Sequence, residues 1–299
     1  MGTPEFAVAS LAALVEAGCN VVAVVTAPDK PAGRGLQLNA SAVKKFAVEK
    51  NLLILQPEKL KSQEFLMTLR ELKADIQVVV AFRMLPEVVW NMPPLGTINV
   101  HGSLLPQYRG AAPINWAIIN GEKVTGVTTF KLVHEIDKGN ILMQEKIPIA
   151  ENETAGELHD RMKIAGASLL VATIKGLAAG SLMEIEQDAV NTSTLKHAPK
   201  IFTEDCKIDF NRSVEDVHNL IRGLSPFPGA FTFLNEKILK IYRTKKMIST
   251  SLLPGSLETD AKTFLRFSCL NGYVEVLELQ LEGKRKMFTE EFLRGYRLT

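Results

Sequence analysis

Two short apolar segments rich in β-branched residues stand out in the first third of the chain. They are residues 20–26 (NVVAVVT) and residues 76–82 (IQVVVAF), and both are apolar on the two faces that a strand would present. Strands of a parallel sheet covered by helices on both sides have this pattern. We therefore predict two buried strands of an α/β sheet.

Segments with helical periodicity surround these strands. Residues 4–18 end at Gly18, which suits a C-terminal cap, and residues 41–51 begin at Ser41, which suits an N-terminal cap. Further strand and helix patterns alternate along residues 97–100, 112–120, 124–133, 141–149 and 154–178. This order predicts a doubly wound, mainly parallel Rossmann-like α/β domain.

The pattern changes after residue 184. Residues 185–203 show no sustained period, which is typical of a linker, and a short helix is predicted over 213–224. Short alternating segments separated by Gly, Pro and Asn then follow at 231–234, 237–244, 263–269 and 273–281. Their spacing predicts a small antiparallel, OB-like β-barrel.

The predicted organisation is therefore an α/β domain, a connector and a smaller β domain. We place the first domain at residues 1–184, the linker at 185–203 and the C-terminal domain at 204–299. A chain of 299 residues is long for one core and sufficient for two.

Composition excludes several classes of protein. Apolar residues make up 46% of the chain and charged residues 23%, and no apolar run is long enough to span a bilayer. Cys19, Cys206 and Cys269 lack the CxxC spacing of a zinc site, and the first residues lack the pattern of a secretory signal. We expect a cytoplasmic protein that binds neither metal nor membrane. The net charge of +2 is too small to indicate a nucleic-acid binder by itself.

A polar pair follows the strand predicted at residues 97–100. Asn99 and His101 are two positions apart, so their side chains share one face at the carboxyl end of that strand, where open α/β sheets bind ligands. Asp137 follows another strand-like segment, and Gly139 allows a tight turn there. An amide, an imidazole and a carboxylate can together support acyl transfer to an amine. A buried polar pair without chemistry is the alternative for Asn99 and His101.

Residues 29–35 (DKPAGRG) form a predicted loop that carries Lys30 and Arg34. The loop lacks the GK[ST] sequence of a Walker A motif, and the turn at Gly2 lacks the GxGxxG fingerprint. The loop is therefore either a contact for phosphate groups or an ordinary solvated turn. Binding of a nicotinamide dinucleotide is disfavoured.

Several blocks, taken as a set, resemble the 10-formyltetrahydrofolate-dependent formyltransferases over essentially the whole chain. The blocks are GTPEFA, APDKPAGRG, INVHGSLLPQYRGAAPI, TGVT, IDKGN, HAPKIFTEDCKIDF and IRGLSPFPGAF. The SLLP block is specific to the wider family, and the other blocks narrow the resemblance to the methionyl-tRNA formyltransferases. The resemblance implies formyl transfer from 10-formyltetrahydrofolate, as co-substrate, to the α-amino group of initiator methionyl-tRNA for translation initiation.

The resemblance also implies roles for individual residues. Asn99 would hydrogen-bond the formyl oxygen, His101 would stabilise the oxyanion or move a proton, and Asp137 would hold the imidazole and pass a proton through water. No metal is needed for this transfer. Residues implied at the folate site are Phe82, Arg83, Leu85, Ser103, Leu104, Leu105 and Pro106. Among them, the AFR sequence at 81–83 replaces the family's usual AYG or AFG, in a loop one residue shorter.

Contacts with tRNA are likewise implied by the resemblance. Arg34 and Lys30 would lie near the end of the acceptor stem, and Lys200 would contact tRNA from the C-terminal domain. Further candidates in that domain are Lys240, Arg243, Lys245 and Lys246. We expect the enzyme to be a monomer.

The family usually has about five apolar strand residues before the GTPEF block, and this sequence starts at Met1 without them. Either the start lies too far downstream or the first strand is absent. In the second case we expect an empty strand position and an apolar slot in the sheet.

Three rival functions are weighed against this prediction. A sugar-nucleotide or glycinamide ribonucleotide formyltransferase would use the same chemistry, but the latter ends soon after the α/β domain. A catalytically silent RNA-binding protein on the same scaffold is disfavoured by the presence of Asn99, His101 and Asp137. A nicotinamide-dependent oxidoreductase is disfavoured by the missing glycine fingerprint.

Overall fold

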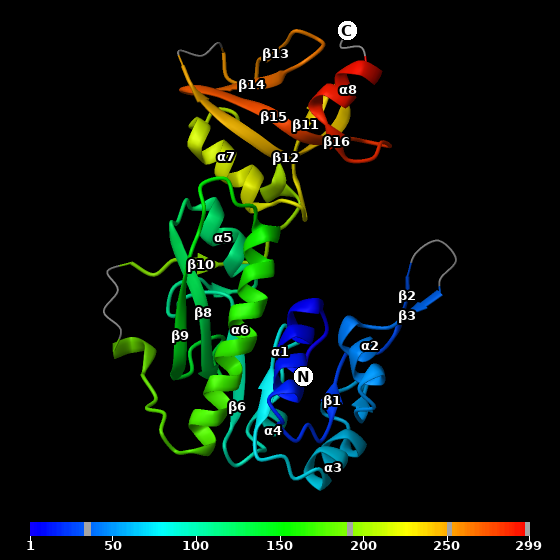
Figure 1. Ribbon diagram of the computed structural model, residues 1–299, viewed down its shortest axis with the longest axis vertical. Helices are drawn as coiled ribbons and strands as arrows, with labels where there is room; N and C mark the ends of the chain where they lie inside the picture. The colour runs from blue at the N-terminus through cyan, green and yellow to red at the C-terminus, as the bar shows by residue number, and fades with distance from the viewer. Residues whose placement is uncertain (33–36, 190–193, 250–252, 297–299) are drawn as a thin grey trace. The chain divides into compact units, whose positions relative to one another are not determined.

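The chain forms two compact units, each of which combines segments that are distant in the sequence. The computed structural model describes residues 1–32, 37–189, 194–249 and 253–296 (Figure 1). Unit 1 comprises Met1–Arg109, Gly126–Ile147 and His159–Lys196. Unit 2 comprises Gly110–Thr125, Pro148–Leu158 and His197–Thr299.

Unit 1 is a Rossmann-like α/β unit. It holds all or most of the strands β1 (Val24–Val25), β4 (Ile54–Leu55), β5 (Gln77–Val79), β6 (Thr97–His101), β8 (Val124–Lys131) and β9 (Ile141–Pro148). Its helices are α1 (Glu5–Glu16), α2 (Ala42–Glu49), α3 (Gln63–Glu71), α4 (Glu87–Trp90) and most of α6 (Ala155–Ala178). The predicted doubly wound, mainly parallel class is confirmed.

Unit 1 contains both parallel and antiparallel strand pairs. β1 pairs in parallel with β4, and β5 pairs in parallel with β6. β8 runs antiparallel to β6 in the order β5-β6-β8-β9. The even alternation of strands and helices in the sequence does not reveal this reversal, because apolar runs do not encode strand direction.

Helix α6 packs against one face of the sheet that contains β6 and β8. A Cβ on Gly166 would lie 3.1 Å from a methyl group of Val100, so the small residue lets the helix approach the strand closely. Thr173 of α6 lies within hydrogen-bonding distance of Thr129 of β8, with 2.8 Å between their hydroxyl oxygens. The catalytic candidates at the end of β6 therefore rest on a well-packed support.

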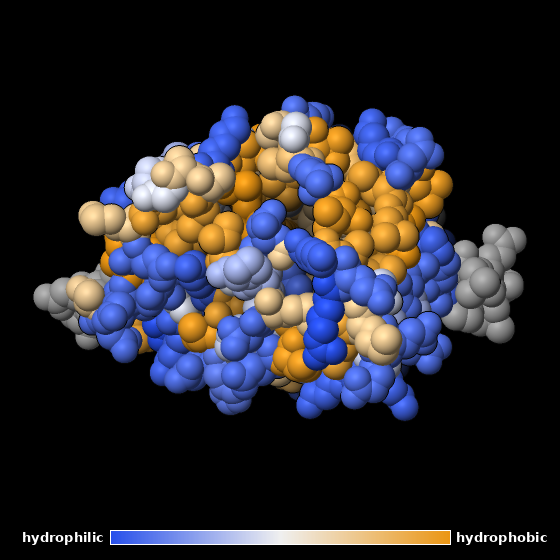
Figure 2. All heavy atoms as spheres, turned by 90° about the horizontal axis from the view of Figure 1, so that it is seen from below, coloured by the Kyte–Doolittle hydropathy of each residue, from blue (hydrophilic) through white to orange (hydrophobic). Residues whose placement is uncertain are grey.

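A cavity of about 370 Å³ lies between β1 and β5. Its lining is mostly apolar and includes residues 20–25 and 76–78, with Leu69 and Leu72 beside them. Met1 and Gly2 bridge the two strands, through Gly2 N to Val25 O and Val80 N to Met1 O. Figure 2 views the end of the molecule at which α3 lies in Figure 1, and apolar residues surround a hollow on that face.

This cavity explains why two strands are shorter than the sequence predicts. The predicted strand at residues 20–26 is reduced to Val24–Val25, and that at residues 76–82 to Gln77–Val79. Residues 20–23 line the cavity, where no neighbouring strand among the described residues continues the ladder. A strand without a partner loses its defining hydrogen bonds.

Two segments predicted as irregular have secondary structure. Residues 29–35 were expected to form a loop, but Lys30–Ala32 (β2) pairs antiparallel with Gln37–Asn39 (β3). The segment assigned as a linker contains the 3-10 turn η1 (Gln187–Ala189) and β10 (His197–Ala198). Short strand pairs and isolated turns depend on hydrogen-bond partners elsewhere in the chain. The local periodicity of hydrophobic residues does not reveal those partners.

Unit 2 contains a curled antiparallel half-barrel, which confirms the predicted OB-like β domain in this form. Its strands are β11 (Ala230–Leu234), β12 (Lys237–Ile248), β13 (Leu257–Thr259), β14 (Leu265–Cys269), β15 (Gly272–Leu281) and β16 (Met287–Phe288). They follow the order β11-β12-β15-β14-β13, and β16 pairs with β15. Other elements of the unit are α5 (Pro113–Ile119), η2 (Glu204–Cys206), α7 (Val214–Gly223) and α8 (Thr289–Gly295), while the two-residue β7 (Arg109–Gly110) pairs with β10.

The core of unit 2 forms where α7 packs on the half-barrel. Ile221, Leu239 and Ile241 are fully buried in one apolar cluster, and Ile119 of α5 packs against its edge. Asn115 of α5 donates its side-chain amide to the carbonyl of Gly223 at 2.8 Å. Helix α7 therefore packs one face on the sheet, and its C-terminal end contacts α5.

Candidate active site

His101 ends strand β6 with both of its ring nitrogens facing polar groups. The residue is 7% exposed, and its Nε2 lies 2.9 Å from the carbonyl oxygen of Tyr108. Because a carbonyl oxygen only accepts, Nε2 must carry a proton and donate it. The other nitrogen, Nδ1, lies 3.8 Å from Oδ2 of Asp137. Asn99, two residues earlier on β6, is half-buried.

The Asp137 turn is shaped by two unusual backbone positions. Asp137 has a left-handed φ of 54°, a conformation that aspartate tolerates better than most residues. Gly139 approaches the end of β8 so closely that a Cβ would lie 1.6 Å from the carbonyl oxygen of Lys131. The sequence predicts that Gly139 serves a tight turn, and the structure adds close packing as the reason why only glycine fits.

The SLLP segment after β6 folds back on β8. Thr128 donates its hydroxyl to the carbonyl of Ser103 at 2.6 Å, and it accepts the backbone N–H of Leu105 at 3.2 Å. A Cβ on Gly126 would lie 2.5 Å from Leu104, so glycine is needed where this segment crosses the strand. Its most deeply placed side chains are those of Ser103, Leu105 and Pro106. The burial of these three side chains is consistent with the predicted role of this segment in shaping the wall of a binding site.

The second loop assigned to folate lies beside β5. Leu85 is buried in a cluster with Val79 and Val89, and Phe82 packs against its edge. Arg83 is exposed, donates to the backbone carbonyls of Pro57 and Glu58, and has its guanidinium carbon 5.6 Å from the Phe82 ring centroid. The guanidinium therefore has backbone partners in its own unit.

The cations assigned to tRNA have different surroundings. Arg34 lies outside the described residues. Lys30 and Lys200 are exposed, and the Lys200 ammonium lies 5.3 Å from the centroid of the Phe202 ring. Among the C-terminal candidates, Lys245 is exposed, whereas three others bind within unit 2: Lys240 to the Pro228 carbonyl, Arg243 to Glu157, and Lys246 to Glu215.

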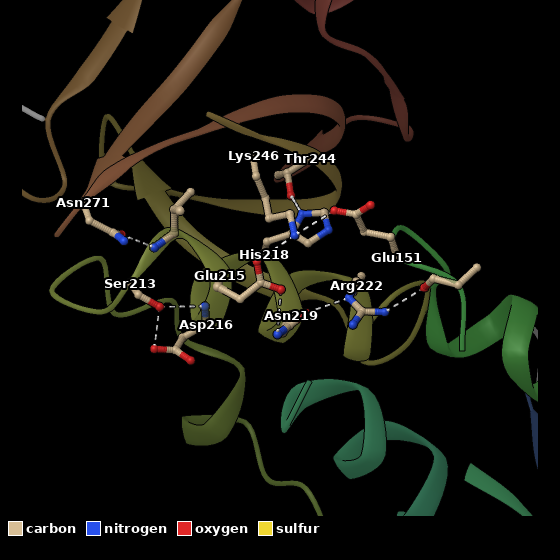
Figure 3. Close-up of polar contacts among 12 residues, drawn as sticks. Glu151, Ser213, Glu215, Asp216, His218, Asn219, Arg222, Thr244, Lys246 and Asn271 are labelled. Carbon is tan, nitrogen blue, oxygen red and sulfur yellow. Dashed lines mark hydrogen bonds and ion pairs between the residues drawn. The ribbon is translucent and has the colours of Figure 1, made fainter. Parts of the chain in front are cut away.

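A second buried histidine, His218, lies on α7 in unit 2 (Figure 3). His218 is 2% exposed, and its Nδ1 lies 2.9 Å from the Thr244 hydroxyl of β12. Burial, and then the positive charges of Lys246 and Arg222, lower the pKa of His218 to about 4. The ring is therefore neutral at pH 7. The sequence gives no reason to assign chemistry to His218, and its surroundings are those of a structural residue.

Acidic and amide groups hold the two cations near His218 in place. Lys246 lies 2.6 Å from Glu215 and 3.2 Å from Glu151 (Figure 3). Arg222 is 3% exposed and donates to the Asn219 side-chain oxygen at 2.8 Å and to a backbone carbonyl of the segment 148–158 at 3.1 Å. Each cation is paired, so the cluster is an internal network of unit 2.

Two residues near the Asp137 turn are absent from the sequence-based assignment. Gln187 is 4% exposed and donates to the carbonyls of Asp137 and Gly139, both at 2.8 Å, while Arg109 donates to its side-chain oxygen. A single glutamine in a stretch without periodicity carries no local sign of this contact. Arg109 stands in the YRG sequence, which Gln107 separates from the SLLP block, and this position near the block is its sequence signal.

Neither a metal site nor a membrane span is found in the described part of the chain. No three His, Cys, Asp or Glu residues there are grouped so that they could hold a metal ion. Within the same residues, no helix has both the length and the apolar character needed to cross a bilayer.

Comparison with known proteins identifies relatives over both units. The family described as Formyl transferase matches residues 1–174, and Formyl transferase, C-terminal domain, matches residues 200–297. Methionyl-tRNA formyltransferase of Bacteroides fragilis is 52% identical over 306 residues, covering 100% of this chain and 94% of the relative. The protein of the same name from Bacteroides thetaiotaomicron is 51% identical, with 100% and 95% covered.

A solved structure shares the fold at lower identity. The N-formyltransferase from Helicobacter canadensis, in complex with folinic acid and dTDP-3-aminofucose, matches with a TM-score of 0.67 and 20% identity, covering 96% of this chain and 97% of that one. Because the two family matches together span nearly all of the chain and full-length relatives exceed 50% identity, the chain belongs to the formyl transferase family.

Proposed function

We propose that this enzyme transfers a formyl group from 10-formyltetrahydrofolate to the α-amino group of initiator methionyl-tRNA. The observation that carries the proposal is the pairing of His101 with Asp137 at the carboxyl end of β6, in a chain 52% identical over its full length to methionyl-tRNA formyltransferase of Bacteroides fragilis. His101 and Asn99 on β6 supply a base and an amide donor, and Asp137 adds a carboxylate; acyl transfer to an amine can use all three.

The reaction exchanges one carbon–nitrogen bond for another. The neutral α-amino group attacks the formyl carbon, and its electron pair forms the new C–N bond while the carbonyl oxygen becomes an oxyanion. As the tetrahedral intermediate collapses, the bond to N10 of the folate breaks and the amine loses a proton. N10 takes up a proton, so no net proton is consumed. The protein must hold two substrates, stabilise the oxyanion and carry that proton.

The orientation of His101 suits the transfer of this proton. Nε2 donates to the Tyr108 carbonyl, so Nδ1 carries the lone pair of the neutral ring. A proton accepted at Nδ1 during the reaction would face the Asp137 carboxylate, whose Oδ2 lies 3.8 Å from that nitrogen. Asn99, from the same strand, would donate its amide to the formyl oxygen.

Substrate contacts complete the proposal. Folate would be bound by the loops that contain Phe82, Arg83, Leu85, Ser103, Leu104, Leu105 and Pro106. Lys30, Arg34 and Lys200 would contact tRNA, with the regions 1–184, 185–203 and 204–299 acting as catalytic domain, linker and tRNA-binding domain. The enzyme would act as a cytoplasmic monomer.

A comparison of acceptors tests the proposal. Labelled formyl transfer from 10-formyltetrahydrofolate is measured with initiator methionyl-tRNA, with glycinamide ribonucleotide and with a dTDP-linked amino sugar. We expect transfer to methionyl-tRNA to be fastest by at least about 100-fold in kcat/KM, because only the cognate acceptor uses the remote contacts. Faster transfer to either other acceptor would refute the assignment.

The role of Arg34 has its own test within the same assay. Arg34→Ala should raise the KM for methionyl-tRNA by about 10-fold or more and leave the KM for 10-formyltetrahydrofolate nearly unchanged, since a cation among phosphates acts on tRNA alone. An equal loss for both substrates would count against a tRNA contact. Lys61→Ala is a matched control that removes an exposed cation from a turn with no assigned role.

A further inference from the structure

The carboxylate of Asp137 has no fixed place unless something holds the turn that carries it. Asp137 is in a left-handed backbone conformation, and the turn follows strand β8 at the close approach of Gly139 to Lys131. The backbone carbonyls of Asp137 and Gly139 both accept hydrogen bonds from one amide, that of Gln187. One side chain therefore holds both ends of this short turn.

The orientation of the Gln187 amide follows from its other partner. Arg109 donates from Nε and Nη2 to the amide oxygen of Gln187, at 2.9 Å and 2.6 Å. A guanidinium group only donates, so the oxygen must face Arg109 and the NH₂ group must face the two carbonyls. With two donated and two accepted hydrogen bonds in a buried place, the amide has one acceptable orientation.

Arg109 links this amide to the other catalytic candidate. It follows directly after Tyr108, whose carbonyl accepts the proton of His101 Nε2. One short segment therefore orients the imidazole through Tyr108 and the carboxylate turn through Arg109 and Gln187. These contacts close a circuit from His101 through Tyr108, Arg109 and Gln187 to Asp137, all within unit 1.

We infer that Gln187 is a positioning residue for formyl transfer, which sets the carboxylate of Asp137 against Nδ1 of His101 and is itself oriented by Arg109. This inference rests on the proposed function of the His101 and Asp137 pair. Gln187 is 4% exposed and its amide is taken up by Arg109 and the Asp137 turn, so we expect its loss to act on kcat. A displacement of about 1 Å in a catalytic group can cost on the order of 100-fold in rate.

The main test compares two glutamines in the full-length enzyme. Gln187→Met removes all four hydrogen bonds at similar side-chain volume, and we expect kcat to fall by about 10-fold to 100-fold while the KM for each substrate stays within about threefold. The matched control is Gln107→Met. Gln107 donates its side-chain amide to the Thr194 carbonyl and accepts the Lys196 backbone N–H, and neither bond reaches the Asp137 turn. The kcat of Gln107→Met should stay within about twofold of the wild-type value.

A charged variant tests the donated hydrogen bonds of Gln187 apart from the accepted ones. Gln187→Glu keeps an acceptor for Arg109 but places an oxygen opposite the carbonyls of Asp137 and Gly139. We expect kcat to fall at least as far as in Gln187→Met, because the donors are what hold the turn. Retention of wild-type kcat by Gln187→Glu would overturn the inference.

A double-mutant cycle with Asp137→Asn shows whether Gln187 acts through the carboxylate. In that background Gln187→Met should lower kcat by less than about twofold, since the group it positions is already lost. The positioning role would be refuted if Gln187→Met lowered kcat as much in the Asp137→Asn background as in the wild type. It would also be refuted if Gln187→Met and Gln107→Met lowered kcat equally. Should Gln187→Met fail to fold, Gln187→Glu takes its place in the cycle. A wild-type enzyme that forms no formyl-methionyl-tRNA would instead refute the proposed function.

Discussion

Unit 1 and unit 2 each bury one histidine, His101 and His218, and the two have opposite electrostatic surroundings. Both rings have one nitrogen held by a nearby oxygen: that of the Tyr108 carbonyl for His101, and that of the Thr244 hydroxyl for His218. The remaining surroundings differ. An aspartate faces His101, whereas two cations lie near His218.

The difference shows that burial does not by itself indicate a catalytic histidine. At His218, desolvation disfavours the imidazolium and the neighbouring cations add to that effect. His218 therefore has its pKa lowered to about 4 and stays neutral across the physiological range. His101 has a carboxylate at 3.8 Å that can stabilise a proton accepted during a reaction.

The largest expected effect separates the two histidines by activity. His101→Asn should lower kcat by about 100-fold to 1,000-fold, or about 3–4 kcal/mol of transition-state stabilisation, with tRNA binding retained. His218→Asn should leave kcat within about threefold. Single-turnover formylation and a filter-binding assay measure the two quantities. If both variants lost activity to the same degree, the functional distinction between the two sites would be wrong.

The next effect is on acid stability, and it comes from His218. The unfolded chain protonates this ring below its ordinary pKa of 6.5, whereas the folded protein does so only near 4. Its contribution therefore disfavours the folded state progressively as pH falls from 6.5 to 4, by up to about 3 kcal/mol, and vanishes above that range. Urea unfolding between pH 7 and pH 4.5 should show a shallower loss in His218→Gln. An unchanged pH slope would contradict the assigned pKa.

A smaller effect concerns the turn that brings Asp137 to His101. Gly139→Ala places a Cβ 1.6 Å from the carbonyl oxygen of Lys131, so the turn must move. We expect kcat to fall by about 10-fold and the free energy of unfolding to drop by about 1–3 kcal/mol. Gly180→Ala is a control, since a Cβ there has nothing within 4 Å, although its φ of +62° brings some strain. Equal kcat in the two variants would show that the turn tolerates displacement.

The smallest effects test the sign of the charges around His218. Lys246→Met removes a cation that lowers the pKa of His218, so the pKa should rise. Glu215→Gln removes a carboxylate that raises it, so the pKa should fall. Each change should alter acid stability by less than about 1 kcal/mol, because both side chains are partly exposed. NMR titration of the His218 ring measures both, and shifts in the same direction would refute this account.

Short-range patterns predict a large part of this structure. The predicted cap Ser41 accepts a backbone N–H at 3.0 Å, and the predicted cap Gly18 follows α1 with a left-handed φ of 75°. Such contacts join residues within one turn of a helix, so nearby sequence contains all the partners. Asn99 and His101 are predictable for the same reason, since strand geometry places alternate residues on one face.

Other features depend on partners that are far away in the chain. The direction of β8, the hairpin of β2 and β3, and the shortened strands beside the cavity all follow from which segments pair. The Gln187 contacts span 48 and 50 residues, within a stretch that has no period. No local rule links such positions, because a side-chain hydrogen bond can join any two residues that folding brings together.

Residue order alone is enough to predict the alternating strands and helices, the later β domain, and the candidate trio Asn99, His101 and Asp137. These depend on hydrophobic period, on capping chemistry and on family-like motifs, all of which can be seen along the chain. Only the tertiary structure shows the distance between His101 and Asp137, the contacts of Gln187 and the neutral state of His218. Distances, burial and local charge determine them, and each arises only when remote segments pack together.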